Sequence, residues 1–252
     1  MTTSTPQTEF PVEAAPRPAP RRLTAAVLCA LLGAGLLGGA GVTGWREQRA
    51  AHRPLTADAA YRKAGSLWRA TPVDTLFPPV LAGAASGPGG SDRTWTRVAL
   101  APDAECAAAL APEWQGLLTE TGAGCTRVLR ATYTDATRSS LIAVGLVFTP
   151  ADATAMGGLR ERLTAPPAYG FTDPQRAAWT ATVLPEAPVV VYAVSAFADG
   201  RTLDKPLPAG DALKKDATGA VARAGLGHEA QAVADRMGRG VQALATAPEP
   251  PK

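Results

Sequence analysis

Histidine and cysteine are scarce in this sequence, and their scarcity excludes several kinds of site. Among 252 residues there are two histidines and three cysteines, too few for a metal centre built on histidine ligands. His228-Glu229 begins like a zinc-protease helix, but no second histidine follows it. The G-x-S-x-G nucleophile motif is also missing, and a Ser-His-Asp set would have to use His228. We therefore expect no metal, no cofactor and no catalytic set, with His228 as a capping or surface residue.

Charge is also limited. Charged residues make up 19% of the chain and the net charge is +3, with no basic stripe interleaved with aromatic residues. We therefore expect no nucleic-acid partner. Hydrophobic residues make up 46% of the chain, enough for one ordinary globular core.

Charge is absent altogether from residues 23–42. About 20 uncharged residues span a bilayer core of ~30 Å as a helix, and Trp45 suits the membrane interface. The sequence therefore predicts a transmembrane helix over residues 23–45. The alternative is a secretory signal peptide cleaved after residues 39 to 43. A polar lead-in of 22 residues and the lack of a clean A-x-A site favour a retained anchor.

Small residues within this segment suggest a second role for it. Gly35 and Gly39 form a GxxxG pair, a pattern that packs two membrane helices together. The alternative interpretation is chance, because the chain is rich in alanine and glycine.

The cysteines decide the predicted orientation, because three arginines lie close to each end of the segment and the positive-inside count is tied. Cys29 lies in the apolar segment, which leaves Cys106 and Cys125 in the soluble part. Such a pair indicates a disulfide formed in an oxidising compartment. Two unrelated buried thiols are the alternative. The disulfide places the C-terminal domain outside the cell membrane.

Composition and breakers divide the chain into six parts. We expect a disordered cytoplasmic tail (1–22), a transmembrane helix (23–45), a juxtamembrane helix with a Pro/Gly-rich linker (46–93), an α+β extracytoplasmic domain (94–200), a C-terminal helical segment (201–245) and a disordered tail (246–252). In the juxtamembrane part, Thr56 is suited to cap a helix that runs to about Arg69.

The order of strand and helix signals predicts a fold. Strands are expected over 94–100, 125–134, 139–148 and 188–197, with helices over 103–118 (broken near Pro112) and 149–163 (capped by Thr149). This β-α-β-β-α-β order is typical of a ferredoxin-like sandwich. Short strand signals in 178–184 add an edge strand.

The second face of that sheet needs a cover. Strands 139–148 and 189–197 are apolar on both faces. The C-terminal region supplies two apolar helical stripes, over 213–224 and 226–244, separated near Gly225. The helix at 56–69 and a homodimer face are other candidate covers.

Other polar and aromatic residues match structural roles better than binding roles. The loop acids match no calcium loop: Asp173, Glu186, Asp199 and Asp204. Arg127 and Arg130 alternate on a predicted strand, either as edge protection or as an anionic-ligand surface. The tryptophans are expected in the core or at its rim: Trp68, Trp95, Trp114 and Trp179.

Four short stretches carry a likeness to a known group: Cys106-Ala-Ala-Ala-Leu110, Trp114, Gly124-Cys125 and Arg130-Ala131-Thr132-Tyr133. With them the chain resembles uncharacterised actinobacterial single-pass membrane proteins with a small disulfide-bearing extracytoplasmic domain. It is also loosely similar to the sensor domains of actinobacterial receptor kinases, although only 22 residues precede the anchor. The resemblance implies an outer domain on one anchor and transfers no site residues.

Three functions follow from this organisation. The preferred one is a membrane-anchored extracytoplasmic binding or sensory/accessory module, non-catalytic, with a protein partner in the envelope or a small ligand. A membrane-tethered envelope hydrolase is the alternative, and it requires acidic residues or His228 to converge in a pocket. The third is a structural or assembly subunit that pairs through Gly35 and Gly39.

Overall fold

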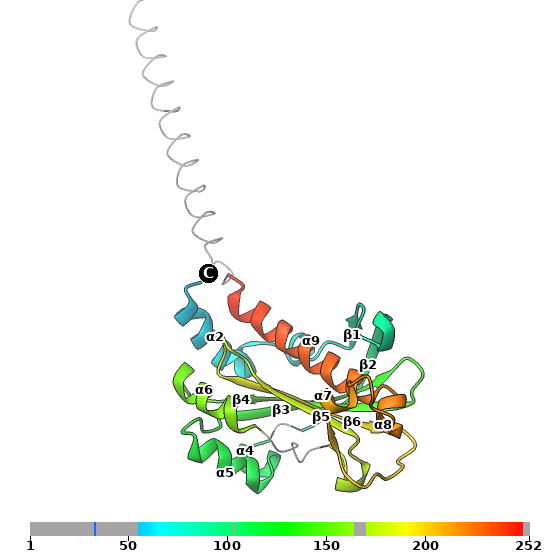
Figure 1. Ribbon diagram of the computed structural model, residues 1–252. Coiled ribbons are helices and arrows are strands. Elements are labelled where there is room, and N and C mark those ends of the chain that lie inside the picture. Colours follow the sequence, from blue (N-terminus) through cyan, green and yellow to red (C-terminus); the bar gives the residue numbers. More distant parts are fainter. Residues whose placement is uncertain (1–32, 34–54, 103, 164–169, 249–252) are drawn as a thin grey trace, which may run out of the picture. The chain divides into compact units, whose positions relative to one another are not determined.

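The computed structural model describes Gly33 and residues 55–102, 104–163 and 170–248 (Figure 1). The chain divides into two units, Met1–Arg53 with Glu249–Lys252, and Pro54–Pro248. Apart from Gly33, the predicted transmembrane helix lies outside the described residues, and so do Gly35 and Gly39. Among the described residues, no helix combines the length and the apolar character needed to cross a membrane.

The second unit is a mixed α+β fold with a seven-stranded sheet and C-terminal helices. The strands are β1 (Val80–Gly83), β2 (Arg93–Leu100), β3 (Arg127–Asp135), β4 (Ser140–Phe148), β5 (Ala178–Val183), β6 (Val189–Phe197) and β7 (Leu207–Pro208). They lie in the order β1-β2-β3-β4-β6-β5-β7. Neighbours are antiparallel except for β5 and β7.

Short helices connect the strands, and one long helix closes the fold. The α-helices are α2 (Ala57–Ala70), α3 (Val73–Leu76), α4 (Cys106–Ala109), α5 (Pro112–Glu120), α6 (Ala153–Arg162), α7 (Ala209–Ala212), α8 (Ala220–Arg223) and α9 (Leu226–Thr246). Two 3₁₀ turns, η1 (Pro88–Gly90) and η2 (Asp173–Gln175), lie in loops.

The strand order corrects the ferredoxin-like prediction. That fold needs the first two strands parallel with a third between them, whereas β2 and β3 are direct antiparallel neighbours. The connection between them folds back on itself, and so β3 begins beside the end of β2. Two contacts show this return: Ala101 N donates to Arg130 O at 3.0 Å, and Ala104 bridges Val128.

One split β-α-β unit is present, but it begins at a later strand. β4 and β5 each pair antiparallel with β6, so they run parallel to each other with β6 between them. Helix α6 makes the crossover. The predicted strand signal at 178–184 is confirmed as β5, and β7 lies outside it at the edge of the sheet.

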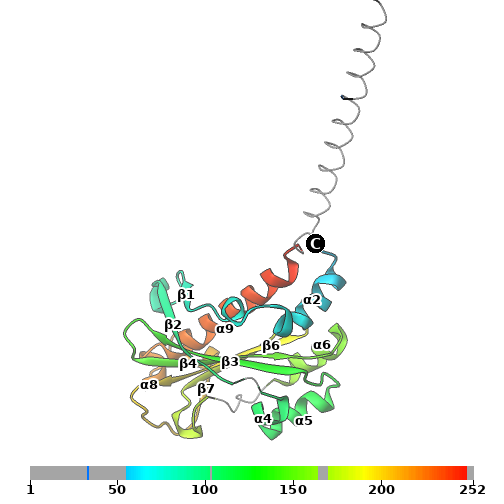
Figure 2. The same ribbon diagram turned by 180° about the vertical axis from the view of Figure 1, so that it is seen from behind.

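Helices cover both faces of the sheet, as the two-sided strands predicted (Figure 2). On one face, alternate residues of β4 such as Val144 and Leu146 pack with α2 and α9. On the other face, Val147 and Tyr192 pack with α5 and α6. The predicted stripe on 226–244 is confirmed by the buried residues of α9, among them Leu226, Ala230, Val233, Met237 and Val241.

The other predicted C-terminal stripe is wrong in its extent. Of the range 213–224 only α8 is helical, because α7 ends at Ala212 and residues 213–219 lie between the two four-residue helices. This stretch contains three charged residues in a row, Lys214, Lys215 and Asp216. The apolar spacing seen on either side of them does not continue through it. Gly225, with φ 73°, then starts α9, as the predicted break requires.

The predicted helix starts are half right. Thr56 caps α2 by accepting a hydrogen bond from Ala59 N. Helix α6 is capped by Asp152, which accepts from Ala155 N, and not by Thr149. The hydroxyl of Thr149 instead donates to Pro188 O at 3.2 Å. A carboxylate is the stronger acceptor for the first N–H groups of a helix, and the start therefore moves three residues along the chain.

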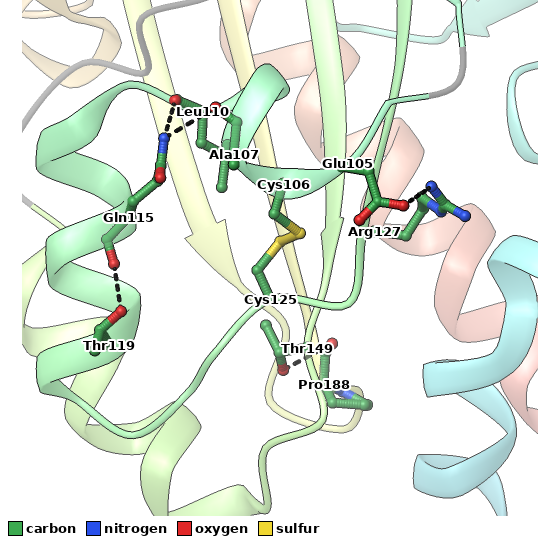
Figure 3. The surroundings of a disulfide bond; sticks show 10 residues. All are labelled: Glu105, Cys106, Ala107, Leu110, Gln115, Thr119, Cys125, Arg127, Thr149 and Pro188. Atoms are coloured by element: carbon green, nitrogen blue, oxygen red, sulfur yellow. Dashed lines mark hydrogen bonds and ion pairs between the residues drawn. A yellow bond between two sulfur atoms is a disulfide. The ribbon is translucent and has the colours of Figure 1, made fainter.

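The predicted disulfide is present between Cys106 and Cys125, with Cα atoms 6.1 Å apart (Figure 3). It joins the start of α4 to the segment that leads into β3. Pro112 begins α5, so the predicted helix is broken into two and the chain can return. The bridge closes a loop between cysteines 19 positions apart. Because it restricts the unfolded chain, it raises the free energy of unfolding by about 3 kcal/mol.

Gly83 on β1 provides a test of this packing, because a Cβ atom there would overlap the ring of Trp95. Trp95 is fully buried. We expect Gly83→Ala to lower the free energy of unfolding by about 1–3 kcal/mol, measured by urea denaturation. Gly116→Ala, in α5 with open space around it, is the control and should be neutral or stabilising. Equal stability of the two variants would contradict the contact.

Candidate functional site

A cavity of about 570 Å³ lies where one end of the sheet meets the start of α9. We call it the Glu229 pocket. Its walls come from β2, the β3–β4 turn, the end of β6 and the α8–α9 junction. The lining residues are Arg93, Asp135, Thr137, Arg138, Ser139, Ser140, Phe197, Ala198, Asp199, Arg201, Ala224, Leu226 and Glu229. The volume is typical of small-ligand sites.

Glu229 is the buried acid of this pocket. It lies in the first turn of α9, with a side chain only 5% exposed. Trp95 Nε1 donates a hydrogen bond to its Oε2, and Arg93 Nε lies 3.7 Å from its Oε1. Burial raises the pKa of Glu229, and the charge of Asp135 adds to this, whereas Trp95 and Arg93 act in the opposite direction. The carboxyl group therefore holds its proton to higher pH than an exposed glutamate does.

Three contacts fix the start of α9 at the sheet and so position Glu229. The Ser195 hydroxyl on β6 donates to Leu226 O at 2.9 Å. Gly227 packs so closely on α7 that a Cβ atom there would lie 2.8 Å from Ala212 Cβ. The Trp95 indole supplies the third contact. An acid on the apolar face of α9 is thereby held between helix and sheet.

Asp135 organises the β3–β4 turn beside Glu229. One of its oxygens accepts hydrogen bonds from Ser140 N at 2.8 Å and Ser140 Oγ at 3.1 Å. The other accepts from Thr137 N, Thr137 Oγ1 and Ser139 Oγ. Burial alone would raise the pKa of Asp135, but these hydrogen bonds outweigh it and lower the pKa to about 2. Its charge is therefore fixed at ordinary pH and holds the turn.

Two further arginines lie at the pocket. Arg138 is exposed in the β3–β4 turn with a positive φ of 56°, and its N–H donates to Asp135 O at 3.0 Å. Arg201 pairs with Asp199 and lies over the ring of Phe197, 4.3 Å from its centroid. With Arg93, these groups give the pocket three guanidinium ions, while Phe197 and Leu226 supply apolar wall.

The structure brings one of the predicted loop acids, Asp199, to the pocket and leaves the others apart. Asp173 pairs with Arg176, Glu186 borders a second cavity, and Asp204 is exposed. His228 is turned from the Glu229 pocket to a smaller cavity beside Ala84 and Asp235. Within the described ranges, no three His, Cys, Asp or Glu residues are grouped to hold a metal ion.

The predicted arginine pair lies away from the pocket, and of the predicted tryptophans Trp95 contacts a pocket residue, Glu229. Arg127 pairs with Glu105 at 3.3 Å and lies over the ring of Trp68. Trp95 and Trp114 are in the core, and Trp179 is also buried. Arg93, Asp135 and Glu229 were not predicted as site residues from the sequence. The sequence contains one signal for Glu229, because this charged residue falls on the apolar face of the 226–244 stripe.

A second cavity, of about 700 Å³, lies beside the starts of α2 and α6. Tyr61 lines it and donates to Ala151 O at 3.1 Å. Its acids, Asp58, Asp152 and Glu186, are exposed. Because these acids are exposed whereas Glu229 is buried, the Glu229 pocket is the stronger candidate.

No family model, curated protein or solved structure matches this chain.

Asp135→Asn tests the turn that shapes the pocket. A carboxylate with a lowered folded pKa stabilises the fold above its unfolded value near 3.8, and this stabilisation is lost as the pH falls towards 2. We expect the variant to lose about 2 kcal/mol of unfolding free energy at neutral pH and less as the pH falls through that window. Urea denaturation at several pH values measures this. Asp204→Asn, a change of an exposed loop residue, is the control. A loss of unfolding free energy in Asp135→Asn that does not depend on pH would contradict this explanation.

Proposed function

We propose that this protein is a membrane-anchored extracytoplasmic binding module whose outer domain takes a small ligand in the Glu229 pocket. The observation that carries this proposal is the Arg93–Glu229 pair, an ionisable pair at the wall of a cavity of ligand size. The Glu229 side chain is 5% exposed and that of Arg93 is 33% exposed, and burying the carboxyl group costs free energy that a packed apolar side chain would not. Such a cost at a cavity wall is typical of a functional site.

Binding is favoured over catalysis by how the acids are used. Asp135 has both carboxylate oxygens committed to the turn, so it is poorly placed to act as a base. Trp95 donates to one oxygen of Glu229, and the other oxygen, Oε1, lies 3.7 Å from Arg93 Nε and accepts no hydrogen bond recorded among the described residues. A carboxyl group with one oxygen open to hydrogen bonding and several guanidinium ions suit recognition of a polar ligand.

The place of the pocket in the domain also supports a tethered module. Leu55, where the described domain begins, and Thr246, at the end of α9, border the second cavity together. Glu229 lies at the other end of α9, a helix of 21 residues and so about 30 Å long. A domain held through either chain end therefore keeps the Glu229 pocket away from the point of attachment.

An envelope hydrolase is the second candidate. Asp135 and Glu229 line one pocket, and their pKa values are displaced in opposite directions, which is the pattern of an acid–base pair. In that case Glu229 would be the proton donor, and Glu229→Gln would abolish turnover while leaving binding intact. Assembly through Gly35 and Gly39 remains a prediction.

The location is tested by reporter fusions and a thiol count on the unreduced full-length protein. We expect a C-terminal reporter to be active outside the membrane. Of three cysteines, two form the disulfide, so one free thiol should remain, that of Cys29. Loss of the free thiol together with a shorter chain would indicate a cleaved signal peptide. Three free thiols and a cytoplasmic reporter would contradict the proposed location.

Ligand binding is tested by filling the pocket. Ala198 is exposed and lines it, so Ala198→Trp should block the cavity without disturbing the core. Ligands of the full-length protein are first found by ligand-observed NMR in a mixture of carboxylates, sugar phosphates, amino acids and neutral sugars. We expect Ala198→Trp to lower the affinity for these ligands at least about tenfold, or ~1.4 kcal/mol.

The matched control is Ala108→Trp, an exposed alanine on α4. It should bind as the wild type does. Binding that survives Ala198→Trp, or no binding by any member of the mixture, would count against the pocket as the site.

A further inference from the structure

Arg93 is an incompletely paired arginine at the wall of the Glu229 pocket. Its Nε lies 3.7 Å from Glu229 Oε1, beyond hydrogen-bond distance, and no acceptor among the described residues reaches this buried nitrogen. The other oxygen of Glu229 is engaged by Trp95. A guanidinium group has five N–H donors in a planar fork that suits oxyanions. Glu229 is therefore a poor partner for Arg93, and the pocket leaves room for a better one.

The charges around Glu229 make its own charge easy to remove. Arg93 faces it from β2 and Asp135 from β3, while its α9 neighbour His228 borders a different cavity. Asp199, Arg201 and Arg138 line the same pocket. Burial and Asp135 both disfavour the ionised form of Glu229. Once it is protonated, the carboxylates left in the pocket are Asp135, whose two oxygens accept hydrogen bonds within the turn, and Asp199, which pairs with Arg201.

We propose that the Glu229 pocket binds the carboxylate, sulfate or phosphate group of a small anionic molecule, which pairs with Arg93 in place of the Glu229 carboxylate, and that Glu229 takes up a proton from solvent as the anion binds. This inference rests on the proposed function and adds the ligand class and its link to pH. No covalent bond forms or breaks.

The rest of the pocket fits such a ligand. Arg138, exposed in the turn, is the second cation available to the anion, since Arg201 is already paired with Asp199. Phe197 and Leu226 offer apolar surface to the carbon part of the molecule. Ser139, exposed on the same turn, adds a hydroxyl group that can donate to an oxyanion.

The first test measures anion affinity against pH in the full-length protein. Sulfate and benzoate are the probes because both stay ionised between about pH 5.5 and pH 8, and glucose is the neutral control. We expect the dissociation constant of each anion to fall as the pH falls, by up to about tenfold per pH unit. Glucose should not bind. An affinity of the wild type that does not change with pH would overturn the proton uptake.

Variants assign this dependence to Glu229. Glu229→Gln keeps an acceptor for Trp95 and removes the charge, so it should bind both anions more tightly than the wild type at about pH 8 and lose the pH dependence. Glu161→Gln, an exposed acid on α6, is the matched control. His228→Gln should keep the wild-type dependence. A dependence that vanished in His228→Gln and persisted in Glu229→Gln would overturn the assignment.

Variants of the arginines test the anion contact. Arg93→Gln should lower the affinity for both anions at least about tenfold. Arg138→Gln changes an exposed turn residue, so it should lower the affinity for the anions less and should fold even if Arg93→Gln does not. Arg160→Gln, exposed on α6, is the control. Anion affinity unchanged in Arg138→Gln and in any folded Arg93→Gln would overturn the inference.

The outcomes separate this inference from the proposed function. If only neutral molecules bind and Ala198→Trp abolishes their binding, the pocket is a binding site but the anion inference is wrong. If the anions bind and Ala198→Trp leaves them unaffected, they bind elsewhere on the surface and both proposals fail.

Discussion

The hydrogen bond from Trp95 to Glu229 joins the sheet to the helix that covers it, and the rest of the domain depends on this junction. Helix α9 packs across β4, β5 and β6 and against α2. Its direction is set at its first turn, where Trp95, Ser195 and Gly227 make their contacts. Because the indole is fully buried, its N–H needs an acceptor, and Glu229 supplies it. The pocket is the space left open beside this junction.

The junction carries a cost that a purely structural contact would avoid. A glutamine would accept the same indole hydrogen bond without bringing a charge into the interior. Glu229 and Arg93 instead keep an ionisable pair at the cavity wall. Nearby, Asp135 is fully hydrogen-bonded and supports the turn. Two acids in one pocket thus have different roles, since one is satisfied by donors and the other is mainly desolvated.

The sequence predicted the fold where the signal was local. The two-sided apolar strands required a second cover, and the 226–244 stripe indicated α9. The even cysteine pair indicated the disulfide, and Pro112 indicated the break that lets the chain return. The strand order was missed because periodicity shows which face of a strand is buried but not which strand pairs with it. β2 and β3 are neighbours because their connection folds back.

By itself the sequence determined the α+β class, the two apolar faces, the cysteine pairing and the covering helix, since each depends on spacing along the chain. Only the tertiary structure decided the sheet order and the pocket. Arg93, Asp135 and Glu229 lie on β2, β3 and α9, and no local pattern joins them. They meet because antiparallel pairing aligns the start of β2 with the end of β3, and because α9 begins at that same end of the sheet.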